Sequence, residues 1–577
     1  MRTYSRPKAL AERRSVSQVV YNFLPGQIVD LRGRVWKVTT WRDPIHLRVD
    51  EATIRRELQR ALTRWDPPTD GDLRRQLAGI EIDIVTPSEQ GVEVVPFPKL
   101  FRCRTCGQIE NDDKGSCVGG NHHTWASFQF VAFHTCGKIG EPFVPRCKTH
   151  HKVRSNQPKS RNARDVRFSC PVCNVHISDG IPYTNCSCGD GKYSVNPPRA
   201  STVYSGHSMV VINPPTMQVA TDFAGEAART TTLDWVLDGM PEANALSRTR
   251  NIQSLVDQFV RMGIDEIQAK KMAVAAARAS GGKIEETGAD IALPSVVREH
   301  AIDGALKLAF ASVNGRITVD DLKRHRGDKS LTDRYEVDYP KAMYSALLEN
   351  VIFLERFPIL TAFYGYSRGD GTKAAATARP ILNWFRERGR LRLYSLKAET
   401  EALVFSLDPV AIIDWLTRRG HAVDAHRSAR DARKFILENA DFPAPGEPAG
   451  PPSIGNDILT LVHSYAHRVL RAITAFCGID REALAEYLIP EHCALIVYAN
   501  TRGDFVLGGL QALFENDLNR ALDRIINGER RCALDPGCRE AGSACMACMH
   551  VGEPSCRYYN RSLTRDILFG ETGFLSH

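Results

Sequence analysis

The sequence of 577 residues lacks several features that would place it in a common class. It contains no run of about 18 uncharged apolar residues, the length that a membrane-spanning helix requires. Its basic N-terminal segment is not followed by an apolar core, so no secretory signal is expected. No G-x-x-x-x-G-K-[ST] loop, G-x-S-x-G elbow or H-E-x-x-H pair occurs, and we therefore expect neither ATP hydrolysis nor a small-molecule substrate.

The overall composition is that of a folded protein. Hydrophobic residues make up 43% of the chain and charged residues 25%, which excludes a disordered or collagen-like protein. At roughly 150 residues per domain, the length allows about three or four domains.

Cysteine is abundant and concentrated in two regions. Of the 16 cysteines, nine lie between Cys103 and Cys188 and five between Cys532 and Cys556. Without a secretory signal, such groups favour metal binding over disulfides and predict a reducing, cytoplasmic location.

The first region predicts three zinc sites, because structural zinc takes four Cys or His ligands that usually come as two close pairs. The clearest set is Cys170, Cys173, Cys186 and Cys188; a second combines Cys103, Cys106 and Cys117 with His122 or His123; a third combines His134, Cys136, Cys147 and His150. For the third set, the alternative is two surface histidines and a buried Cys136 thiol. Exchange of ligands between neighbouring sets also stays open.

The second region predicts one further metal site. Its five cysteines are Cys532, Cys538, Cys545, Cys548 and Cys556. Four of them complete an all-cysteine site and one is spare, but the sequence leaves open which one. An iron–sulfur cluster is an alternative; we favour zinc, because short pairs with intervening glycines are typical of zinc ribbons. In total we expect about four zinc ions.

A basic segment begins just before the candidate ligand Cys147. Residues 146–167 hold eight Lys and Arg against one acid, Asp165. Such a patch predicts contacts to nucleic-acid phosphates, and the alternative is a solvated loop. The candidate residues are Lys148, Lys152, Arg154, Lys159, Arg161 and Arg164.

The elements predict an α+β multidomain protein in four parts. These are an N-terminal α+β region (1–100), a Cys-rich zinc-ribbon-like module (101–200), a mostly helical middle region (201–440) and a C-terminal α/β zinc-binding domain (456–577). Residues 17–41 are expected to form short strands and residues 391–407 a hairpin. In the C-terminal part we expect a helix over 458–476, a buried strand over 493–499 and a helix over 508–526.

Two histidines lie four residues apart in the first of these C-terminal helices. His463 and His467 therefore share one face, and they could bind a metal or a phosphate. The interpretation that we favour is a packed helix edge with polar partners.

The C-terminal residues also carry a resemblance to a known family. The segments LVHSYAHRVL, ALIVYANTRGDFVLGGLQALF and CALDPGCREAGSACMACMHVGEPSCRYYNRSLTRDIL resemble the domain shared by the DrmB family of the DISARM anti-phage system and the MrfA-type helicases. Upstream, QVVYNFLPGQIVDLRG, PPRASTVYS and FPILTAFYGYSRGD also resemble DrmB. The resemblance implies metal ligands at Cys538, Cys545, Cys548 and Cys556, with Cys532 as a further candidate. Where the family has an upstream C-x2-C pair, this chain has Cys117 followed by His122 and His123.

The resemblance further implies a non-enzymatic partner of a superfamily-2 helicase, DrmA, in a complex that engages phage DNA. Two alternatives remain. The first is a zinc-dependent nuclease or hydrolase, which needs an open metal position and a carboxylate near His463 and His467. The second is a protein that binds nucleic acid alone through its ribbons.

Overall fold

The structure is a computed structural model of the chain. It describes residues 10–62, 65, 77–113, 116–120, 122, 124–156, 162–241, 256, 259–260, 262–279, 293–313, 315–324, 329–369, 380–423, 428–443, 452–500, 507–528, 530–552, 555–558 and 560–576. It is a mixed α/β protein with several Cys-rich clusters. Among the helices described, none has the length and apolar character needed to cross a membrane.

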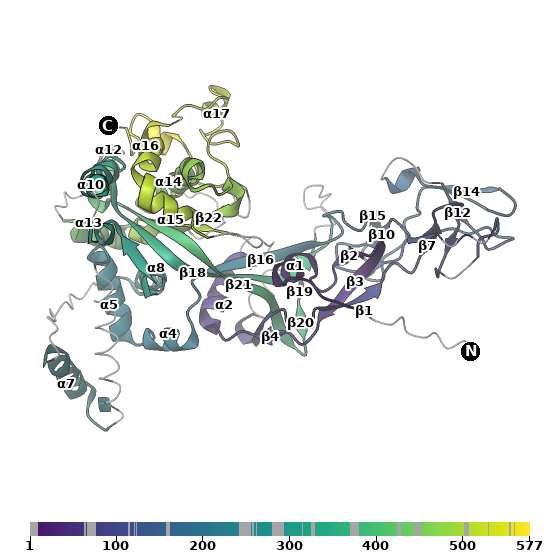
Figure 1. Ribbon diagram of the computed structural model, residues 1–577, viewed down its shortest axis with the longest axis horizontal. Coiled ribbons are helices and arrows are strands. Elements are labelled where there is room, and N and C mark those ends of the chain that lie inside the picture. The colour runs from purple at the N-terminus through teal and green to yellow at the C-terminus, as the bar shows by residue number, and fades with distance from the viewer. Residues whose placement is uncertain are drawn as a thin grey trace. The chain divides into compact units, whose positions relative to one another are not determined.

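The chain divides into two compact units. The first comprises Met1–Glu51, Arg55–Val210 and Leu360–Lys397, and the second comprises Ala52–Ile54, Val211–Ile359 and Ala398–His577. The division falls within two long strands, β18 (Leu348–Ser367) and β21 (Arg390–Leu407), which are labelled in Figure 1. Each half of these strands is described with its own unit.

The first unit begins with a four-stranded antiparallel sheet of order β1-β6-β3-β2. Its strands are β1 (Leu10–Glu12), β2 (Ile28–Leu31), β3 (Arg34–Trp41) and β6 (Val92–Pro96). Part of the predicted strand region is wrong, because Val16–Asn22 forms helix α1. Val19 and Val20 of this helix are fully buried and pack with Val38 and Trp41 in one hydrophobic cluster.

Further elements lie wholly or largely in this unit, and one of them, β5, pairs in parallel with the Leu391–Tyr394 segment of β21. They are β4 (Ile45–His46), α2 (Glu51–Ala61), β5 (Ile82–Thr86), β16 (Ser205–Ile212), β19 (Asn383–Trp384) and β20 (Arg386–Glu387). The predicted hairpin over 391–407 is wrong, because these residues form one continuous strand.

The Cys-rich part of the first unit is built from very short strands in three three-stranded sheets, β8-β7-β9, β11-β10-β15 and β12-β13-β14. The bounds are β7 (Phe101–Cys103), β8 (Ile109–Glu110), β9 (Trp125–Ser127), β10 (Val131–Phe133), β11 (Ile139–Gly140), β12 (Arg154–Ser155), η2 (Ala163–Asp165), β13 (Arg167–Ser169), β14 (His176–Asp179) and β15 (Ser194–Asn196). A small core that includes Phe128, Phe130, Val153 and Phe168 lies between them. Sheets this small have little independent stability.

The second unit combines helices with the remaining halves of β18 and β21. Its elements before β18 are α4 (Met217–Asp222), α5 (Glu226–Leu237), α7 (Glu266–Ala279), α8 (Ser295–Val313), β17 (Arg316–Thr318), α9 (Val319–Arg324), α10 (Lys329–Asp333), η3 (Arg334–Asp338) and α11 (Tyr339–Ser345). After β21 come α12 (Pro409–Arg418), α13 (Ala429–Asn439), α14 (Ile454–Cys477), η4 (Arg481–Ala483), β22 (Leu484–Ile489), η5 (Pro490–His492), β23 (Ala494–Ala499), α15 (Gly509–Ala512), η6 (Leu513–Asp517), α16 (Leu518–Asn527), α17 (Gly537–Glu540) and α18 (Asp566–Phe569).

Helix α14 lies at the centre of the second unit. The Ser453 side chain caps its first turn by accepting a hydrogen bond from the Asn456 N–H, and Gly478 ends it with a left-handed φ of 67°. Two-thirds of its residues are buried, and the helix contacts β22, β23, α16 and α18. Figure 1 labels α14, α16 and β22 in this part of the second unit. The three elements predicted for this part of the chain are confirmed, as α14, the fully buried β23 and the run α15–η6–α16.

Candidate metal centres

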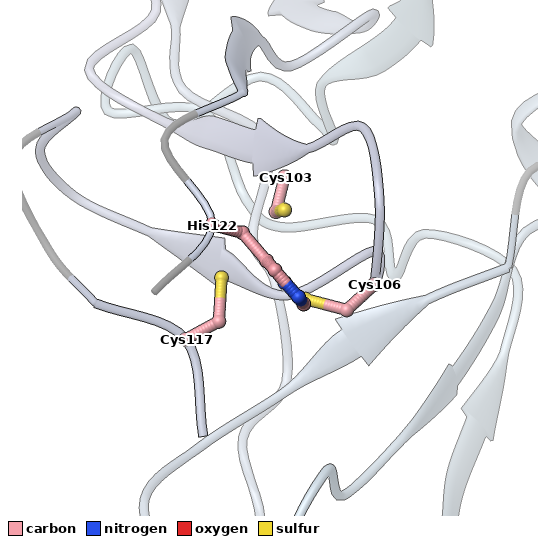
Figure 2. A group of neighbouring side chains, drawn as sticks. All are labelled: Cys103, Cys106, Cys117 and His122. Carbon is pink, nitrogen blue, oxygen red and sulfur yellow. The ribbon is translucent and has the colours of Figure 1, made fainter. Parts of the chain in front are cut away.

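The first cluster of metal-ligating side chains contains Cys103, Cys106, Cys117 and His122, and we call it the N-terminal cluster. Figure 2 shows the three sulfur atoms and the imidazole turned toward one another. Their ligand atoms all lie within 4.8 Å of each other. The sequence left His122 and His123 open as the fourth ligand; the structure brings His122 to the cluster, and His123 lies outside the described residues.

The Cys103–Cys106 pair sits in a turn that recurs twice more, and we call it a knuckle. The carbonyl of the first ligand accepts a hydrogen bond from the N–H four residues later, which comes from Gly107, His151 or Asn174. That residue has a left-handed φ of 77°, 52° or 57°. The first ligand's own N–H donates to the carbonyl of the next residue along, which is Gln108, Lys152 or Val175. The repeated hydrogen bonds bring both ligand atoms of each pair to one side of the turn.

The two remaining knuckles face each other. Cys147 and His150 lie beside Cys170 and Cys173, and we call this group the inner cluster. The His150 Nδ1 atom is 3.7 Å from Cys147 Sγ and 3.6 Å from Cys170 Sγ, and the two sulfurs of Cys147 and Cys173 are 4.0 Å apart.

The outer cluster contains His134, Cys136, Cys186 and Cys188. Cys136 Sγ is 3.7 Å from Cys186 Sγ, and Cys188 Sγ is 3.4 Å from the His134 Nδ1 atom. Each pair is followed by a glycine with left-handed φ, Gly137 or Gly189, which lets the chain turn back behind the ligands.

The pairing predicted for these two clusters is therefore wrong, although all eight ligands were identified. The sequence joined Cys170 and Cys173 to Cys186 and Cys188, and His134 and Cys136 to Cys147 and His150; the structure exchanges the partners. Strand pairing explains the exchange. β12 runs antiparallel to β13 with Arg154 opposite Ser169, so the knuckles before β12 and after β13 meet. β10 runs antiparallel to β15 with Phe133 opposite Ser194, which brings the outer pairs together.

The C-terminal cluster contains four of the five cysteines in its region, Cys532, Cys538, Cys545 and Cys548. The sulfur of Cys545 is 3.6 Å from that of Cys532 and 3.7 Å from that of Cys548. Asp535 supports this cluster: it accepts the Cys532 N–H at 2.9 Å and both of its carboxylate oxygens are 2.9 Å from Arg565 Nη2.

Cys556 is the spare cysteine, so the ligand set that the family resemblance implied is corrected. Its sulfur lies instead beside His463, His467 and Glu486. Cys532 takes the place that the resemblance gave to Cys556, because residues 532–535 turn back onto the Cys545–Cys548 pair.

The spacing of the sulfur atoms fits a metal ion better than disulfides. A tetrahedral zinc site with Zn–S bonds of about 2.3 Å places its sulfurs about 3.8 Å apart. The sulfur–sulfur distances in the outer, inner and C-terminal clusters run from 3.6 to 4.0 Å, whereas a disulfide bond measures about 2.05 Å. All 16 cysteines are free thiols. Each of the four clusters could therefore hold a metal ion.

Hydrogen bonds from the backbone prepare some of these thiols for binding a cation. Burial raises the pKa of the Cys103 thiol, but the N–H of Cys106 and the Thr124 hydroxyl outweigh this and lower its pKa to about 6. In the same cluster, burial and the neighbouring sulfurs raise the pKa of Cys117 to about 12. Burial likewise opposes ionisation of Cys545, and backbone and thiol hydrogen bonds lower its pKa to about 7. In each case the thiolate is the form that binds metal.

The basic residues predicted to contact phosphates have different surroundings. Lys148 and Arg164 are exposed. Lys152 forms an ion pair with Glu110 at 2.8 Å, and Arg154 donates to Ser169 and the Asn174 side chain. Lys159 and Arg161 lie outside the described residues.

Comparison with known protein families gives a match in the first part of the chain. Residues 15–193 match the model of a domain of unknown function, DUF8724. The matched range contains the N-terminal, inner and outer clusters and ends shortly after Cys188, the last ligand of the outer cluster. No curated protein matches the chain.

Proposed function

We propose that this chain is a non-catalytic zinc-binding subunit that partners a DrmA-like superfamily-2 helicase and helps to bind DNA in bacterial anti-phage defence. The four clusters each hold a zinc ion. Every cluster offers four Cys or His donors, which is the complete ligand set of a structural zinc site and leaves no position for a reacting water. In the proposed complex the helicase hydrolyses ATP, consistent with the lack of a P-loop motif in this sequence.

The position of Lys148 is the observation that best supports the proposed contact with DNA. This exposed residue lies inside a knuckle, between the ligands Cys147 and His150 of the inner cluster. A zinc ion there fixes the backbone on both sides of Lys148 and thus the position from which its ammonium reaches a phosphate. Arg164, exposed in the same basic segment, provides a second contact. Phosphate contacts of this kind contribute affinity but no sequence specificity.

The partnership is tested by co-purifying the full chain with the superfamily-2 helicase encoded beside it. We expect a complex that survives size-exclusion chromatography at low salt. Two separate peaks at low salt would contradict the proposed role.

The DNA contacts are tested with the double variant Lys148→Glu, Arg164→Glu in that complex. Its affinity for duplex DNA should fall, and the slope of log affinity against log salt should decrease by about two, one for each lost phosphate contact. The matched control is Lys271→Glu, Arg418→Glu, which reverses two exposed charges on α7 and α12. Equal slopes for the two double variants would refute the assignment.

A further inference from the structure

A fifth group of metal-ligating side chains lies in the interior of the second unit. It consists of His463, His467, Glu486 and Cys556, and we call it the buried histidine cluster. The two histidines and the glutamate are 0% exposed and Cys556 is 2% exposed. The Nε2 atoms of His463 and His467 lie 3.1 and 3.4 Å from Glu486 Oε1, and His463 Nε2 lies 3.3 Å from Cys556 Sγ.

The hydrogen bonds behind the two imidazoles decide which ring nitrogens are free to bind a cation. His463 Nδ1 lies 3.2 Å from the carbonyl oxygen of Ser562, and His467 Nδ1 lies 2.7 Å from that of Met549. Because a carbonyl oxygen only accepts, each Nδ1 carries the proton, and in the neutral ring each Nε2 presents a lone pair. Metal-bound histidines typically make this same hydrogen bond with their second nitrogen.

The centre of the cluster therefore gathers several acceptors around one weak donor, the thiol of Cys556, whose sulfur lies 3.3 Å from His463 Nε2. Among the described residues, neither His467 Nε2 nor either carboxylate oxygen of Glu486 has a hydrogen-bond partner. Leaving three such buried atoms unsatisfied is costly, and a buried carboxylate needs a positive partner.

We propose that the buried histidine cluster binds a fifth metal ion, a zinc ion held by Nε2 of His463 and His467, one carboxylate oxygen of Glu486 and the thiolate of Cys556. The thiol proton leaves to solvent as the ion binds. With Zn–N and Zn–O bonds of about 2.0–2.1 Å, tetrahedral ligands lie about 3.3 Å apart. The nitrogen–oxygen distances of 3.1 and 3.4 Å match this spacing.

The donor set and its burial favour a closed zinc site over a reactive one. Two histidines and a carboxylate also bind non-haem iron, but such iron sites keep open positions for their reactants. Here Cys556 supplies a fourth, soft ligand. With all four side chains buried, the ion has no route to a substrate and acts as a structural link.

The ion would tie together three segments that are distant in the sequence: α14, β22 and the C-terminal segment around Cys556. Hydrogen bonds already join the C-terminal segment to the other two, because the Glu486 N–H donates to the Ser555 carbonyl and His463 Nδ1 on α14 donates to the Ser562 carbonyl. The Met549 carbonyl that orients His467 directly follows Cys548, a ligand of the C-terminal cluster. The two sites therefore share one piece of backbone.

The first test counts zinc ions per chain by mass spectrometry of the purified full-length protein. Cys556→Ala should lose one zinc ion per chain relative to wild type. The control is Cys477→Ala, which should lose no zinc ion. Cys477 is also buried, but it lies on α14 and belongs to none of the five clusters among the described residues. A Cys556→Ala protein that folds and retains the wild-type zinc content would overturn the proposal.

A second test needs no variant. Crystals of the full-length wild-type protein should show an anomalous difference peak at the zinc absorption edge between His463, His467, Glu486 and Cys556. The absence of a peak at this site would overturn the proposal. It would mean that a proton shared between an imidazole and the carboxylate takes the place of the metal ion. A peak present at the iron edge and absent at the zinc edge would overturn the assignment to zinc.

Discussion

The crossed pairing of the inner and outer clusters makes a prediction that the alternative pairing does not share. In Cys170→Ala the inner cluster loses one of its four ligands, while the outer cluster keeps all of its own. We expect Cys147 and Cys173 to become reactive toward alkylating reagents and Cys136, Cys186 and Cys188 to stay protected. The alternative pairing, which joins Cys170 and Cys173 to Cys186 and Cys188, predicts instead that Cys186 and Cys188 become reactive and that Cys147 stays protected.

The structure indicates how large this effect is. Strands β12 and β13 pair through only two residue pairs, Arg154 with Ser169 and Ser155 with Phe168. A backbone hydrogen bond contributes about 0.5–1.5 kcal/mol net, whereas structural zinc contributes about 10–16 kcal/mol in small zinc domains. Without its ion, the knuckle that holds Cys147 therefore opens locally.

The assay is alkylation of the purified full chain followed by peptide mass spectrometry, which reads each cysteine separately. The reciprocal variant Cys188→Ala should expose Cys136 and Cys186 and spare Cys147. Cys477→Ala serves as the control, because it lies outside every cluster found among the described residues. The reasoning is refuted if Cys170→Ala labels Cys186 faster than Cys147.

Three further outcomes test individual contacts. Gly107→Ala should destabilise the N-terminal cluster by about 1–3 kcal/mol, because φ at this position is 77° and a Cβ would overlap the Ser155 carbonyl. The measurement is the rate of zinc loss to a chelator, which should increase. Burial opposes ionisation of Asp457, but its pKa is held below the usual value by Arg419 and a neighbouring histidine. Its charge thus stabilises the fold at neutral pH, and this stabilisation is lost as the pH falls through the folded-state pKa. Asp457→Asn should therefore lower the free energy of unfolding in urea by about 1–3 kcal/mol at pH 7 and leave it unchanged in strong acid. Trp415→Ala should lower the free energy of unfolding by about 3–5 kcal/mol in the same assay, because this side chain is fully buried. An unchanged midpoint of the urea unfolding curve would show that Trp415 is not packed as described.

The sequence identified the Cys and His residues of the clusters well because most of the pairs are local. A Cys and a second ligand three residues later need only one tight turn, and the residue that follows each pair, such as Gly107 or Asn174, marks the left-handed position. The partner of each pair depends on strand pairing between distant residues, and strands of two or three residues have almost no pattern in the sequence.

The buried histidine cluster shows the same limit. His463 and His467 were recognised as one helix face, but Glu486 lies in a strand and Cys556 beyond the C-terminal cluster. The charge of Glu486 within the otherwise apolar run of β22 was the available signal, because a buried acid needs a partner.

Two errors in secondary structure have physical explanations. The hairpin predicted over residues 391–407 is wrong because this stretch contains no Gly, Asn or Asp for the positive φ of a tight turn. Lys397 and Glu399 are exposed on one side of an extended strand. For α1, the run Val19–Val20 is short and apolar, and periodicity does not separate a helix from a strand at that length.

The crossed ligand pairs also set an order of assembly. A ribosome that releases the chain from its N-terminus presents His134 and Cys136 long before Cys186 and Cys188, and all four inner ligands emerge in between. The inner ion can be captured first, and it shortens the flexible chain that the outer pairs must close, which lowers the entropy lost on closure. Zinc uptake during synthesis would then proceed from the middle of this module outward.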